Sequence, residues 1–70
     1  MKKIIDFIIE QQLEDLDDYP TLVKPISEKF NIDLDVAEEI INTVIGWEGS
    51  PTNESLETVL KRFFPDIVTN

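Results

Sequence analysis

Apolar residues recur along the chain at the three- and four-residue spacing of amphipathic helices, and they do so in four segments. These segments span residues 3–16, 21–30, 33–45 and 54–64. No stretch alternates between apolar and polar positions for long enough to predict a strand. The pattern therefore predicts an all-α fold, a compact bundle of four short helices. No repeat or long linker divides the chain, so we expect residues 1–70 to form a single small domain.

The first two segments predict helices with one apolar face each. In the first, the i, i+3, i+4 spacing assigns the core face to Ile5, Ile8, Ile9, Leu13 and Leu16. Ile4 and Phe7 fall toward the other side of this helix. In the second, the buried face is predicted to carry Leu22, Val23, Ile26 and Phe30. Asp18 and Thr21 are both possible N-caps of the second helix, and Pro25 is tolerated if it lies in the first turn.

The third segment has the widest apolar stripe, which predicts a central helix that packs against several neighbours. Asp33 is expected at the N-cap, and Gly46 at the left-handed position that follows the helix. The centre of the core is assigned to Ile40, Ile41 and Val44.

The C-terminal part is predicted as a loop, a helix and a tail. Residues 47–53 contain Gly49, Ser50 and Pro51, which predict the loop. The helix that follows is expected to be capped by Asn53 or Ser50. Its core face is assigned to Leu56, Val59, Leu60 and Phe63. Pro65 should end it and leave residues 65–70 as a loose C-terminal tail.

Residues 25–45 resemble a helix-turn-helix unit. The resemblance rests on Ser27 inside the first helix, Asn31 at the turn, Ile32 just after it, and Ala37 and Ile40 facing inward. It implies a helix-turn-helix-like core whose second helix would present its exposed face to the DNA major groove. That face carries Asp35, Glu38, Glu39 and Asn42. Phosphate would repel these carboxylates, so nucleic-acid binding through this helix is not expected and is kept as an alternative. A basic patch would require the fold to gather Lys24, Lys29, Lys61 and Arg62.

The charge and the missing residue types narrow the chemistry. Fifteen acidic against six basic residues give a net charge of -9, which repels nucleic acid and anionic membranes. With no Cys and no His, disulfides, the usual zinc ligands and the common nucleophile–base pairs are absent. Residues 31–35 resemble the opening of a calcium loop, but Val36 and Asn42 stand where Gly and Glu are needed. We therefore expect no enzyme, no cofactor, no metal site and no small-molecule substrate.

Two sets of residues could contact a partner protein. The acidic set is Asp35, Glu38 and Glu39, for which a solubilising role is the alternative. The aromatic set is Phe7, Trp47 and Phe64, which could equally close the end of a small core.

These sets favour a non-catalytic, acidic protein-interaction module with an unknown protein partner, and formation of a homodimer is left open. An acidic decoy of a DNA-binding protein is a further alternative. Charges such as Asp6 and Glu10 interrupt the apolar segments, so no membrane span is predicted and a cytoplasmic location is expected.

Overall fold

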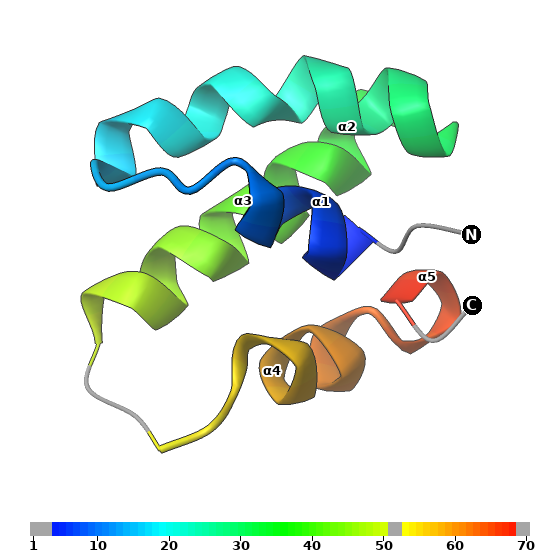
Figure 1. Cartoon of the computed structure of the whole chain (residues 1–70). Helices are drawn as coiled ribbons and strands as arrows, with labels where there is room; N and C mark the ends of the chain where they lie inside the picture. Colours follow the sequence, from blue (N-terminus) through cyan, green and yellow to red (C-terminus); the bar gives the residue numbers. More distant parts are fainter. Residues whose placement is uncertain (1–3, 51–52, 69–70) are drawn as a thin grey trace.

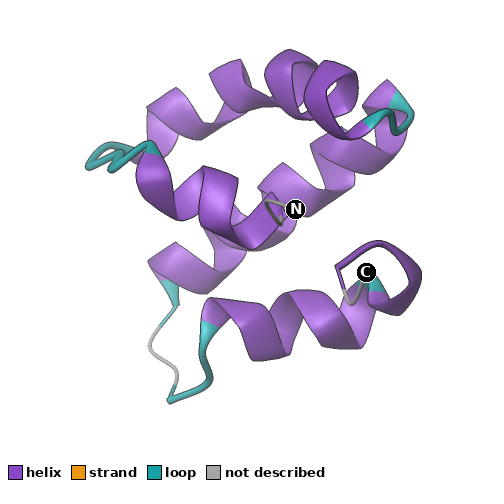
Figure 2. Cartoon of the chain, turned by 45° about the vertical axis from the view of Figure 1, so that its right-hand side comes forward, coloured by secondary structure: helices purple, strands orange, loops and turns teal. Residues whose placement is uncertain are grey.

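The structure is a computed structural model that describes residues 4–50 and 53–68. In these residues the chain forms helices joined by short turns and contains no strand, which confirms the all-α prediction (Figure 2). The elements in chain order are α1 (Ile4–Glu10), the 3-10 helix η1 (Leu16–Leu22), α2 (Val23–Phe30), α3 (Leu34–Gly49), α4 (Leu56–Phe63) and α5 (Pro65–Val68).

The long helix α3 forms the centre of the bundle. The segment made of η1 and α2 packs along one side of α3, and α4 packs on the opposite side, with α1 lying between them (Figure 1). α5 follows α4 after a short turn and packs back against it.

The core is entirely apolar among the described residues. Ile26, Ile40, Ile41, Val44 and Leu60 are its largest fully buried side chains, so the predicted centre on α3 is confirmed. No polar or charged side chain is buried with them. Since these buried side chains form no polar network, burial of apolar surface is the main contribution to the stability of the core.

α1 is shorter than predicted, and this changes which of its residues are buried. The helix ends at Glu10, and Gln12 adopts a left-handed backbone conformation with a φ of 52°. The chain then changes direction, and the Asp15 carboxylate caps η1 by accepting a hydrogen bond from the Asp17 amide at 2.9 Å. Consequently Leu16 no longer shares a helical face with Ile5, and its side chain is 38% exposed.

The burial of α1 also corrects two assignments within the helix itself. Ile4 was placed away from the core but is buried, whereas Ile9 was placed in the core but is 60% exposed. The rest of the fold covers the side of α1 that carries Ile4, Ile5 and Ile8 and leaves Ile9 in solvent. The apolar stripe of α1 is therefore wider than its covered face.

α2 begins at Val23 because the preceding residues form η1, which runs directly into it. Neither Asp18 nor Thr21 caps α2; Leu22 occupies the N-cap position, and the Thr21 hydroxyl donates to the Asp18 carbonyl at 2.6 Å. Pro25 lies in the first turn, where its missing amide hydrogen leaves no bond unmade.

α3 continues through Gly46 to Gly49, so the predicted end at residue 45 is wrong. Gly46 has no positive φ and is an interior helical residue. Ile45 and Trp47 both pack against the core, and this packing continues the helix past a residue of low helix propensity. At the other end, Asp33 occupies the predicted N-cap position, without a side-chain hydrogen bond.

The C-terminal elements also differ from the predictions. Ser55, instead of Asn53 or Ser50, caps α4, since its side chain accepts a hydrogen bond from the Thr58 amide at 3.1 Å. Phe63 was assigned to the core face of α4 but is 61% exposed.

Residues 65–68 form the short helix α5, with Ile67 packed against the core, instead of a loose tail. The predicted tail also includes residues 69–70, which lie outside the described part of the chain.

Candidate functional site

The turn between α2 and α3 is fixed by local backbone and side-chain contacts. Asn31 ends α2 in the left-handed conformation with a φ of 55°. The Ser27 hydroxyl donates to the Ile32 carbonyl at 2.6 Å, and the Ile32 amide donates to the Ser27 carbonyl at 3.1 Å. These bonds fix the turn, while Ala37 on α3 packs fully buried against the core.

The acidic α3 face (Asp35, Glu38 and Glu39) is exposed to solvent along its whole length. Among the described residues, no Lys or Arg forms an ion pair with these three carboxylates. In a helix-turn-helix docking geometry this face would enter the major groove, where the phosphates on either side would repel its carboxylates.

The four basic residues considered as a possible patch are divided between two sides of the molecule. Lys24 and Lys29 are on α2 and Lys61 and Arg62 are on α4, with α3 between these helices (Figure 1). The Lys29 ammonium lies 5.4 Å from the centre of the Phe7 ring, and Lys61 pairs with Glu57 at 3.3 Å. The described structure therefore brings no basic ridge together from these four residues.

The three candidate aromatics are partly buried and lie on α1, on α3 and directly after α4. Phe7, Trp47 and Phe64 are all half-buried and pack against the core. Phe7 makes an edge-to-face contact with Phe30 at 5.9 Å between ring centres, which joins α1 to α2. Among the described large apolar side chains, the exposed ones are Ile9, Leu16, Leu34 and Phe63 instead.

One of these exposed residues, Ile9, lines an open groove of about 600 Å³ between α1, η1, the end of α3 and the start of α4. We call it the α1–α4 groove. Its described lining residues are Ile5, Asp6, Ile8, Ile9, Gln12, Leu13, Tyr19, Trp47, Glu48, Ser55, Leu56 and Glu57. A groove of this volume is within the range of protein sites that bind ligands or side chains of a partner.

The floor of the α1–α4 groove is apolar. Ile5, Ile8 and Leu56 contribute buried side chains, and Trp47 contributes a half-buried ring. Ile9 stands on the wall with 60% of its surface exposed. Apolar surface that remains open to water in this way is available to gain free energy on binding a partner.

The rim of the groove is negative. It carries Asp6, Glu48 and Glu57, and no Lys or Arg occurs among the described lining residues. Glu57 pairs with Lys61 on the next turn of α4, whereas no described Lys or Arg pairs with Asp6 or Glu48.

Tyr19 from η1 contacts Glu48 beside the groove. The Tyr19 hydroxyl donates to the Glu48 carboxylate at 3.4 Å. Burial raises the pKa of Tyr19, and the charge and hydrogen bond of Glu48 raise it further. This contact joins η1 to the last turns of α3 across one side of the groove.

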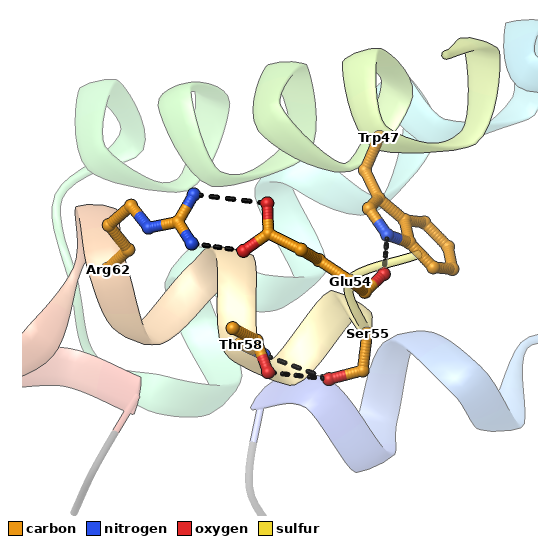
Figure 3. A network of polar contacts seen from close by, with 5 residues as sticks. All are labelled: Trp47, Glu54, Ser55, Thr58 and Arg62. Atoms are coloured by element: carbon orange, nitrogen blue, oxygen red, sulfur yellow. Dashed lines mark hydrogen bonds and ion pairs between the residues drawn. The ribbon is translucent and has the colours of Figure 1, made fainter. Parts of the chain in front are cut away.

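A polar network links the end of α3 to the residues that lead into α4 (Figure 3). The Trp47 indole N–H donates to the Glu54 backbone carbonyl at 2.8 Å. The Glu54 carboxylate forms a two-point ion pair with Arg62, and this hydrogen bonding lowers the pKa of Glu54. Trp47 therefore serves both as a groove residue and as a structural contact.

The groove offers shape, apolar surface and negative charge, and little else for chemistry. Within residues 4–50 and 53–68, no three carboxylates lie together as a potential metal site. Sequence reasoning singled out Trp47 but missed Ile9, Glu48 and Tyr19. The one sequence indication was that the apolar residues of the first segment do not all share a face, since Ile4 and Phe7 fall away from the face that carries Ile9.

Comparisons of the chain with family models, with curated proteins and with solved structures find no match. No helix in the described part of the chain has the length and apolar character needed to cross a bilayer.

Proposed function

We propose that this chain is a non-catalytic, acidic protein-interaction module that binds a basic region of a partner protein. The observation that carries the proposal is the α1–α4 groove, in which an apolar floor and the exposed Ile9 lie beside a rim without a described basic residue. Apolar contact supplies affinity in such interfaces, and complementary charge supplies steering and choice of partner.

The overall charge supports the same conclusion. A net charge of -9 accelerates encounter with positively charged surfaces and slows encounter with polyanions. Salt screens this attraction over a Debye length of about 8 Å at physiological ionic strength. Binding to the partner should therefore weaken as salt is added.

The proposal is tested by affinity capture from lysate of the source cell with the full chain immobilised through its C-terminus. We expect mass spectrometry to identify a basic protein that added salt elutes. The control is the same resin carrying Glu38→Lys/Glu48→Lys, which reverses charges on α3. Capture of nothing above bare resin would contradict the proposal.

The alternative is a nucleic-acid-binding helix-turn-helix protein, which the α2–turn–α3 geometry favours. The acidic α3 face opposes it, because specific DNA binding normally requires several Lys or Arg contacts to phosphate. Fluorescence anisotropy with a mixed-sequence duplex at low salt discriminates between the two. We expect no change in anisotropy, whereas micromolar binding that weakens steeply with salt would favour the alternative.

An acidic decoy is a special case of the proposed function. It would bind a DNA-binding protein on its DNA-contacting surface through carboxylates such as those of the acidic α3 face. In that case the captured partner should be released by added duplex DNA, whereas a partner held elsewhere should stay bound.

A further inference from the structure

We propose that the α1–α4 groove binds one amphipathic, basic helix of the partner protein, with the apolar face of that helix on Ile9 and Leu56 and its Lys or Arg residues beside Asp6 and Glu48. This inference rests on the proposed function and names the site and the partner chemistry.

Charge identifies the occupant as basic. Asp6 and Glu48 lie on the rim, and no described Lys or Arg pairs with either carboxylate, so both can accept contacts from the cations of a partner. An acidic segment placed in the groove would instead be repelled by them, and by the net charge of -9.

The same charge argument disfavours a second copy of this chain as the occupant of the groove. Phe63 is the exposed apolar residue that lies next to basic side chains, Lys61 and Arg62. Both basic side chains are already paired, with Glu57 and Glu54 respectively. A second copy would thus bring a large negative charge and few cations available for the rim.

The secondary structure of the groove walls identifies the occupant as a helix. Most lining residues belong to α1, η1, α3 and α4, whose backbone groups are largely bonded within their own helices. An extended peptide would find no strand edge to pair with in the described structure. A helix satisfies its own backbone and needs from the groove only side-chain contacts.

The experiment uses two synthetic peptides of about 14 residues, roughly four helical turns, as probes. One repeats Leu on one face and Lys on the other, and the matched peptide has Glu in place of every Lys. Binding to the full chain is followed by Trp47 fluorescence, since Trp47 is the only Trp of the chain and lines the groove. NMR shift mapping of backbone amides locates the site independently.

The groove variants are Ile9→Ser and Glu48→Lys, and their matched controls are Leu34→Ser and Glu38→Lys. Ile9 and Leu34 are 60% and 55% exposed, so both Ser variants should fold. Glu48 and Glu38 are both exposed residues of α3, but only Glu48 lines the groove. Circular dichroism checks the fold, and Asp6→Asn replaces Glu48→Lys if loss of the Tyr19 contact unfolds the chain.

We expect micromolar binding of the basic peptide only, weakened about tenfold or more by each groove variant and changed less than about twofold by the controls. Shift changes should centre on residues 5–9, 47–48 and 55–57. Equal binding of the acidic peptide overturns the inference. Loss of basic-peptide binding in Glu38→Lys alone also overturns it, because that result would place binding on the acidic α3 face.

Two further outcomes also overturn the inference while separating it from the proposed function. A dimer that Ile9→Ser dissociates would show that a second copy occupies the groove. Failure of the basic peptide to bind, together with salt-sensitive capture of a basic protein from lysate, would reject the groove as the site and retain the proposed function. Failure of both experiments would reject both.

Discussion

Trp47 illustrates how a single side chain can join two helices and line a groove at once. Its indole N–H reaches the Glu54 carbonyl, seven residues further along the chain. The half-buried side chain packs against the core and also lines the α1–α4 groove. The same residue therefore contributes to stability and to the proposed binding surface.

Replacement of Trp47 by Phe should remove this hydrogen bond and leave the Glu54 carbonyl without its indole donor. We expect the free energy of unfolding to fall by about 1–2 kcal/mol, measured by urea denaturation. Phe63→Leu is the control, since Phe63 is 61% exposed, and it should stay within about 0.5 kcal/mol of the wild type. Equal effects of the two changes would show that the hydrogen bond adds nothing to stability.

Tyr19 should make stability fall at high pH. Its pKa is raised in the folded chain, so above the unfolded value near 10.0 the folded state keeps a proton that the unfolded state has lost. The contribution of Tyr19 to the free energy of unfolding is fully present below about pH 10. It is lost as the pH rises through the pKa of Tyr19 in the folded chain.

Ultraviolet absorbance reads this titration directly, because Tyr19 is the only Tyr of the chain. The stability of Tyr19→Phe is measured alongside that of the wild type, so that the contribution of Tyr19 is isolated by difference. The variant should lose less stability over this range, and identical pH profiles would contradict the expectation.

At the scale of elements, α3 is the helix whose course decides the shape of the groove. Its extension from Ile45 to Gly49 carries Trp47 and Glu48 onto helical positions, where they line the groove together. If α3 ended at residue 45, Glu48 would not be placed by the helix next to Tyr19. Trp47 and Glu48 would also lose the helical spacing with which they line the groove.

Gly46→Ala should stabilise the chain by about 0.5–1 kcal/mol, because Ala costs less backbone entropy than Gly inside a helix. An added Cβ would meet no atom within 4 Å, so no clash offsets the gain. Thermal or urea unfolding measures the effect. Destabilisation instead would indicate a left-handed backbone at Gly46 and a helix that ends there.

At the scale of the whole molecule, the net charge of -9 opposes both compaction and self-association. The two ion pairs within the described residues, of Lys61 with Glu57 and Arg62 with Glu54, are exposed and contribute little in return. The apolar core must therefore offset the repulsion among the acidic side chains.

Added salt should raise the melting temperature, since screening weakens this repulsion more than it weakens the exposed ion pairs. Differential scanning calorimetry across a salt series measures the shift. Light scattering in the same buffers should show a monomer at low salt. A melting temperature that falls with salt would show that attractive pairs dominate the electrostatics.

Predictions from the sequence were most accurate where burial is nearly complete. Ile40, Ile41 and Val44 were assigned to the centre and are there, because a helix covered on most sides has a clear apolar pattern. Ile9 and Phe63 were assigned wrongly although both fall within the predicted apolar stripes, because α1 ends at Glu10 and α4 at Phe63, so that each lies near a helix end. Whether such a position is covered depends on where the neighbouring helices pass, and the local sequence carries no such information.

By itself, the sequence determined the helical class, the central residues of the core, the negative charge and the lack of Cys and His chemistry. These depend on local periodicity and composition, which any fold of this chain must respect. Only the tertiary structure decided that Gly46 stays helical, that Ile4 is covered while Ile9 is not, and that Tyr19, Glu48 and Leu56 meet around one groove. The physical reason is that burial is a contact between segments distant in sequence, and its free energy outweighs the weaker preferences of single residues for a helix end or an exposed face.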